Sequence, residues 1–178
     1  MSVGECTAYS FALKGYVTII HKDAEGHVKR CETVHNLINA QALNWIASTW
    51  GQGAAGSAIR YMGLAMTNDQ AGAVTGPSSA DNTISAEMLA FTQTSENGTM
   101  GRMTASYAHA AGAQSWTMST TWSSGNTTLS GYVYYVALAA CQSAGGTPVM
   151  AAASFAVVSK ASQDSLTIAW TFCVSNSV

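Results

Sequence analysis

Residues 115–123 read Ser115-Trp116-Thr117-Met118-Ser119-Thr120-Thr121-Trp122-Ser123, and this stretch decides the expected fold. Every second position belongs to one face of the expected strand: Trp116, Met118, Thr120 and Trp122. The small polar residues Thr117, Ser119 and Thr121 stand between them. Successive side chains of a β-strand point to opposite faces of a sheet, so the alternation predicts a half-buried strand. The same pattern returns near the C-terminus, where Leu166, Ile168, Trp170 and Phe172 alternate with Thr167, Ala169 and Thr171.

Further extended segments lie on both sides of this strand. We expect strands at residues 59–66, 102–109, 129–141 and 149–158, with turns at 110–114, 123–126 and 143–148. Residues 15–21 and 27–34 form a predicted hairpin, in which Asp23 starts a type I turn and Gly26 takes the positive φ of a closing bulge. Strands of this length with regularly spaced turns predict a mainly β fold, an antiparallel β-sandwich or jelly roll.

One α-helix is expected, at about residues 39–50. Asn39 is a favourable N-cap, and Ile38 and Leu43 have the spacing of a hydrophobic staple. An apolar face is predicted at i, i+3, i+4 and i+7, made of Leu43, Ile46, Ala47 and Trp50. Three glycines, Gly51, Gly53 and Gly56, then end the helix.

The domain organisation is expected to be simple. A chain of 178 residues with 48% apolar content has enough material for one core. We expect an N-terminal arm at residues 1–14 and one β-sandwich domain at 15–178, with a long loop at about 67–85 that serves as an interaction loop. Residues 85–91 fit either a short helical turn or a strand.

Charge is scarce in the second half of the chain. Between residues 103 and 178, only Lys160 and Asp164 carry a charge, and charged residues make up 9% of the whole chain. Soluble domains usually have about 25%. Because depletion of charge is typical of an interface core, this composition predicts a subunit that packs against copies of itself or a larger shell.

Composition also argues against two kinds of partner. A formal net charge of −2 and a pI near 6.0 give no basic field for nucleic acid. The longest apolar run, residues 132–141, is half of the roughly 20 residues that a membrane-spanning helix needs. The N-terminus has no basic region before a long apolar core, so we expect no signal peptide and synthesis in the cytoplasm.

The four cysteines Cys6, Cys31, Cys141 and Cys173 have no CxxC spacing, so the sequence does not predict a zinc site. We expect them to be buried free thiols. A disulfide between Cys6 and Cys173 is the alternative, if the protein matures outside the reducing cytoplasm.

The search for catalytic residues finds no set of side chains with a known chemistry. Most of the nine acids fall in predicted turns or loops, and the chain has neither a GxSxG nor a GxxxxGK motif. His21 and His27 flank the hairpin turn, but their spacing matches no standard metal site. We therefore expect no catalytic, cofactor-binding or metal-binding residues, no cofactor and no enzymatic activity.

Aromatic residues raise the possibility of a carbohydrate-binding module. The alternating positions of Trp116, Trp122 and Trp170 predict that these side chains lie in the core instead. For Trp45 and Tyr61 the sequence does not decide between a core position and an exposed one. Such a module would bind glycans through an exposed aromatic pair.

Five segments carry a resemblance to a known group of proteins. They are residues 15–23 (GYVTIIHKD), 34–40 (VHNLINA), 59–65 (IRYMGLA), 145–151 (GGTPVMA) and 164–171 (DSLTIAWT). In this order they resemble small structural proteins of tailed-bacteriophage virions, which include capsid decoration (cement) proteins, head fibres and tail-associated proteins. The resemblance covers most of residues 15–174.

The resemblance implies a virion part without saying which one. The charge-poor composition favours a non-enzymatic capsid decoration protein that stabilises the phage head. We expect it on the capsid surface, bound to the major capsid protein and associated with itself as a trimer at three-fold positions. Residues 1–13 and the loop at 67–85 are the expected docking segments. The alternative is a tail-fibre or tail-tip component that contacts the host.

Overall fold

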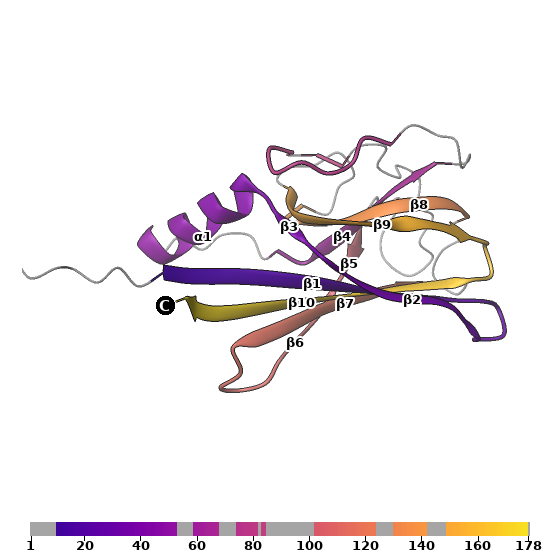
Figure 1. Ribbon diagram of the computed structural model, residues 1–178, viewed down its shortest axis with the longest axis horizontal. Helices are drawn as coiled ribbons and strands as arrows, with labels where there is room; N and C mark the ends of the chain where they lie inside the picture. Colours follow the sequence, from indigo (N-terminus) through magenta and orange to yellow (C-terminus); the bar gives the residue numbers. More distant parts are fainter. Residues whose placement is uncertain are drawn as a thin grey trace, which may run out of the picture.

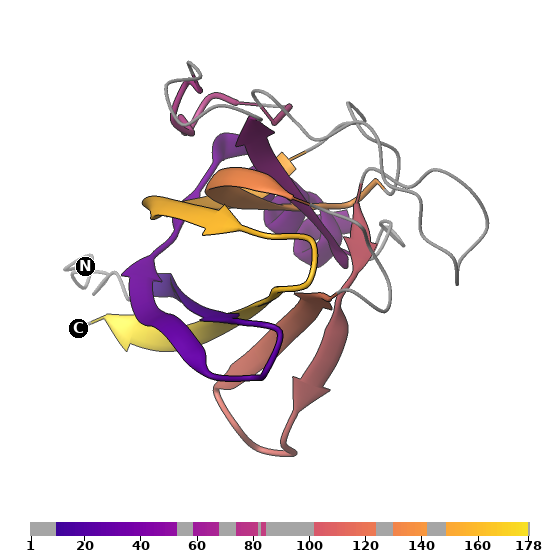
Figure 2. The same cartoon turned by 90° about the vertical axis from the view of Figure 1, so that its right-hand side faces the viewer.

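The computed structural model describes residues 10–52, 59–67, 74–81, 83–84, 102–123, 130–141 and 149–177. These residues form a mainly β protein of two antiparallel five-stranded sheets with a helix at one end (Figure 1). Figure 2 looks along the strands and shows one sheet above the other, with the helix at the far end. The predicted antiparallel β-sandwich is therefore confirmed.

Each sheet combines strands from distant parts of the chain. In sheet A the order is β2 (Val28–His35), β1 (Ser10–Lys22), β10 (Ser165–Ser177), β7 (Ser115–Trp122) and β6 (Ser106–His109). In sheet B it is β3 (Leu37–Ile38), β9 (Val149–Lys160), β8 (Gly131–Ala139), β4 (Tyr61–Thr67) and β5 (Met103–Thr104). Four of these eight neighbouring pairs are joined by a crossover, while β1–β2, β4–β5, β6–β7 and β8–β9 are consecutive.

The central pairing of sheet A joins the two ends of the chain. Strands β1 and β10 pair without a break from Ser10 opposite Ser177 to Lys22 opposite Ser165. The predicted arm at residues 1–14 is therefore too long, because residues 10–14 belong to β1. The extended β10 offers backbone donors and acceptors along both edges, and β1 pairs with one edge while β7 pairs with the other. Residues 1–9 lie outside the described part of the chain.

The core lies between the two sheets and follows the predicted alternation. Trp122 and Trp170 are fully buried, as are Leu166 and Ile168 of β10. Sheet B contributes inward residues of three strands: Met62, Leu64, Val133, Val136, Leu138, Ala151 and Ala153. The period-two pattern of the sequence is thus confirmed for β7 and β10.

Residues 102–109 were expected to form one strand, and this prediction was wrong. The structure has two short strands, with β5 in sheet B and β6 in sheet A. The chain passes from one sheet to the other at the buried Ala105, whose N–H donates to the carbonyl of Arg60 (2.7 Å). A local sequence pattern carries no information on such a change of sheet.

Helix α1 (Ala40–Gln52) begins where the N-cap predicts. The N–H of Ala42 donates to Oδ1 of Asn39 at 3.2 Å, which satisfies one of the free donors of the first turn. The predicted apolar face was wrong at two positions, however: Leu43 is 57% exposed, so it does not form the staple, and Ala47 is also exposed. Ile46 of the predicted face does point to the sandwich, together with Ala42 and Trp45, which share its helical spacing. The side chain of Trp50 lies outside the described part of the chain.

The described part of the loop at 67–85 covers the outer face of sheet B (Figure 1). Ile84 is buried there against Tyr135 and Ala137, and Val74 packs beside them. The side-chain amide of Asn39 donates to the carbonyl of Asp81 at 2.9 Å. This part of the loop is therefore held on the sheet. The predicted features at residues 85–91, 124–126 and 143–148 lie outside the described residues.

Candidate functional site

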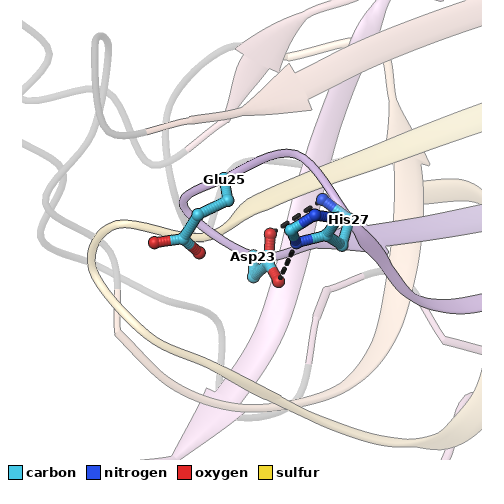
Figure 3. A group of neighbouring side chains, drawn as sticks. All are labelled: Asp23, Glu25 and His27. Carbon is cyan, nitrogen blue, oxygen red and sulfur yellow. Dashed lines mark hydrogen bonds and ion pairs between the residues drawn. The ribbon is translucent and has the colours of Figure 1, made fainter.

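The β1–β2 turn brings three potential ligands together (Figure 3). One ligand atom each from Asp23, Glu25 and His27 lies within 4.8 Å of the others. Oδ1 of Asp23 accepts a hydrogen bond from the backbone N–H of His27 (2.8 Å), and Oδ2 lies 3.1 Å from its Nδ1. The N–H of Gly26, with φ at 90°, donates to the Asp23 carbonyl, which confirms the predicted turn. These bonds explain the cluster as turn chemistry.

Desolvation and hydrogen bonds within the same turn together set the pKa of Asp23. Partial desolvation acts to raise the pKa of its carboxyl group, but the hydrogen bonds from the backbone and ring of His27 outweigh this effect. The pKa of Asp23 therefore lies below its ordinary value. The neighbouring His21 does not join the cluster, because its side chain is buried and contacts Asp164.

The two charged residues of the C-terminal half meet inside the protein. Lys160 is 1% exposed and Asp164 is 4% exposed, at the two ends of the β9–β10 turn. Oδ2 of Asp164 lies 2.7 Å from Nε2 of His21, 3.0 Å from Nζ of Lys29 and 3.2 Å from the N–H of Ala161. Nζ of Lys160 donates to the Ala161 carbonyl at 3.1 Å. We call His21, Lys29, Lys160 and Asp164 the buried polar cluster; Lys29 is exposed, and its ammonium group reaches the buried carboxylate from the surface.

Burial and ion pairing shift the pKa values of Asp164 and Lys160 in opposite directions. Burial raises the pKa of Asp164, but hydrogen bonds from Lys29, His21 and Ala161 lower it more, so the carboxylate form is favoured. Burial lowers the pKa of Lys160, and the nearby Asp164 offsets this only in part. The cluster joins β1 and β2 to the β9–β10 turn. Its geometry is that of a structural ion-pair network.

The outer face of sheet A carries no Asp, Glu, Lys or Arg side chain between Lys14 and Lys22 of β1. We call it the neutral face and define it by the outward residues of four strands: Cys31, Thr33, Tyr16, Thr18, Ile20, Thr167, Ala169, Thr171, Thr117, Ser119 and Thr121. Charged side chains of β1 stand only at its ends, at Lys14 and Lys22. The sequence predicted the alternation but not that four strands would align their small polar residues.

The threonine hydroxyl groups of the neutral face are paired across strands. The Oγ1 atoms lie 2.9 Å apart in Thr18 and Thr33. Two further pairs join β7 to β10: Thr121 with Thr167 (2.8 Å) and Thr117 with Thr171 (3.3 Å). Such pairs stabilise the sheet, and they also lower the cost of removing the face from water, because each threonine hydroxyl keeps a partner.

A cavity of about 610 Å³ opens between the sheets at the α1 end of the sandwich. Its walls are mainly apolar and come from both sheets and the helix: Leu13, Ile38, Ala42, Trp45, Ile46, Ile59, Arg60, Thr104, Ala105, Tyr107, Trp116, Met118, Leu138, Met150, Ala151, Phe172 and Val174. The cavity is open to solvent, so its apolar walls meet water unless a ligand or a second surface covers them.

The structure also places the remaining candidates from the sequence. Trp116, expected in the core, lines the cavity together with Trp45, and Tyr61 is half-buried beside Arg60. The prediction of buried thiols was wrong for Cys31, which is exposed because it lies on the outward side of the edge strand β2. Cys141 and Cys173 are half-buried free thiols. Cys6 lies outside the described residues.

Three comparisons with known proteins complete the description of the chain. No protein-family model, no curated protein and no solved structure matches it. Among the described residues, no helix has the length and hydropathy needed to cross a membrane.

Proposed function

We propose that this protein is a non-enzymatic structural component of a tailed-bacteriophage virion, most directly a decoration (cement) protein on the capsid surface. The neutral face is the observation that carries the proposal. Its central strands β10 and β7 have no charged side chain on the outer side, as an interface core requires.

The chemistry of the neutral face suits a permanent contact. Each Å² of apolar area that such a contact removes from water stabilises the complex by roughly 25 cal/mol. An unpaired charge in such a contact would cost several kcal/mol, and the centre of this face has none. Its paired threonine hydroxyls lower the remaining desolvation cost. Many symmetric copies on a shell would add these modest contributions.

The partners that we propose are the major capsid protein and further copies of this chain, assembled as a trimer at three-fold positions. Residues 1–9 and the loop at 67–85 are additional docking segments. A decoration protein acts by bridging neighbouring capsid subunits, so it needs a matching surface and no catalytic group or cofactor.

A charge placed on the neutral face tests the proposal. Capsid shells that lack this protein are mixed with the purified chain, and binding is measured by co-sedimentation. Ala169→Glu, at the centre of the face, should weaken binding at least about tenfold, because a buried carboxylate without a partner is costly. Asn44→Glu adds the same charge on the exposed side of α1 and should bind normally.

Both variants are first checked for the wild-type circular-dichroism spectrum. Normal binding of Ala169→Glu would contradict the neutral face as the docking surface. Wild-type protein that binds purified tails but not shells would favour the tail alternative.

A further inference from the structure

The cavity at the α1 end has the size and lining of a small-molecule site. Its volume of about 610 Å³ lies inside the range of roughly 300–1,000 Å³ that is typical of such sites. Nine elements supply its walls, including β1, α1 and β10, which lie far apart in the sequence. This site is separate from the neutral face, because its residues point between the sheets.

The walls favour an apolar molecule. On one side Trp116 stacks on Phe172, with ring centroids 5.2 Å apart and an interplanar angle of 18°. Trp45 and Ile46 of α1 also line the space, and Met118 and Met150 add flexible thioether side chains that adapt to a ligand's shape. An ordered water needs two to four polar partners, and these walls offer few.

Arg60, an exposed residue, is the one cationic residue among the described residues that line the cavity. Arg60 precedes β4, and its backbone is fixed by two bonds: its N–H donates to the Ala139 carbonyl (3.3 Å), and its carbonyl accepts from Ala105 (2.7 Å). Its guanidinium carbon lies 5.7 Å from the centre of the Tyr61 ring. The ion pairs within the described ranges involve His21, His27, Lys29 and Arg30, and none involves Arg60.

We propose that this cavity binds an amphipathic small molecule with an aliphatic or aromatic body and one anionic group, of the class of a long-chain carboxylate. The body occupies the space between Trp116 and α1, and the anionic group pairs with Arg60. A guanidinium matches a carboxylate with two parallel hydrogen bonds, which gives the site its preference for an anion. This inference does not depend on the proposed role in the virion.

Three ten-carbon probes with different head groups test the preference: decanoate, decanol and decyltrimethylammonium. Each is titrated below its micelle concentration into the full-length protein, and binding is followed by the fluorescence of the tryptophans, of which Trp45 and Trp116 line the cavity. Decanoate should bind saturably, with an affinity at least about tenfold higher than that of the cationic probe.

Matched variants separate the head-group contact from the cavity. Arg60→Gln should weaken decanoate about tenfold and leave decanol unchanged. Ala42→Phe fills the cavity from α1 and should weaken both, whereas Leu43→Phe adds a phenyl ring on the exposed side of the same helix and should change neither. If Ala42→Phe alters the circular-dichroism spectrum, Ala151→Leu fills the cavity from sheet B instead.

Three results would overturn the proposal. They are the absence of saturable binding by the full-length protein, equal affinity for all three head groups, and equal effects of the Ala42 and Leu43 variants. The first would mean that part of the protein or a second copy fills the cavity.

Discussion

The Nε2 atom of His21 lies 2.7 Å from the Oδ2 atom of Asp164, and this buried contact ties the end of β1 to the turn before β10. Lys29 of β2 reaches the same carboxylate oxygen at 3.0 Å. Lys160 and Asp164 are the only charged residues in residues 103–178, and both are buried. One cluster thus holds the hairpin on the sandwich and keeps these two charges away from the surface.

Asp164→Asn should lower the free energy of unfolding by about 3 kcal/mol, because it leaves a buried network without its central anion. Urea unfolding followed by circular dichroism measures the change. Gln163→Ala is the matched control, since Gln163 lies in the same turn and is exposed; it should stay within about 0.5 kcal/mol of wild type. Equal unfolding midpoints for wild type and Asp164→Asn would show that the cluster does not stabilise the fold.

The contribution of Asp164 should depend on pH. Its folded pKa lies below the ordinary 3.8, so the unfolded chain takes up the proton first as the pH falls. The contribution is complete above about pH 5 and is lost as the pH falls through the folded pKa. Asp23, whose pKa is also lowered, is present in both proteins and cancels in the difference.

The measurement is the free energy of unfolding of wild type and of Asp164→Asn between neutral pH and acid unfolding. Their difference should be constant near neutrality and shrink below about pH 4. A difference that persists unchanged in acid would mean that Asp164 is not held as a carboxylate.

Gly131→Ala should destabilise the protein by about 1–3 kcal/mol. Gly131 opens β8 with φ at 142°, and a Cβ atom there would lie 2.7 Å from the backbone oxygen of Thr67 on β4. Gly76→Ala is the control, because a Cβ at Gly76 meets no atom within 4 Å. Thermal unfolding compares the two variants, and similar midpoints would refute the backbone constraint at Gly131.

The sequence predicted those parts of the fold that depend on neighbouring residues. The alternation around Trp122 and Trp170 identifies the buried side of β7 and β10, Asn39 marks the start of α1, and Gly26 closes the first hairpin. Each of these features rests on a local rule: the period of a strand, the free donors of a helix, or the φ of a turn.

Features that depend on distant residues could not be read in the same way. Two stripes of α1 have helical spacing, and only the position of the sheets selects Ala42, Trp45 and Ile46 over Leu43. His21 and Asp164 are 143 positions apart, and their contact requires the register of β1 with β10. The cavity and the neutral face likewise exist only after strands from distant parts of the chain align.

The copy number of this protein in purified phage particles, relative to the major capsid protein, tests the central claim most directly. Quantitative mass spectrometry of intact particles provides it. The proposed decoration role predicts a fixed ratio that matches the number of capsomers. A handful of copies per particle would assign the protein to the tail, and its absence from the particles would contradict the virion role altogether.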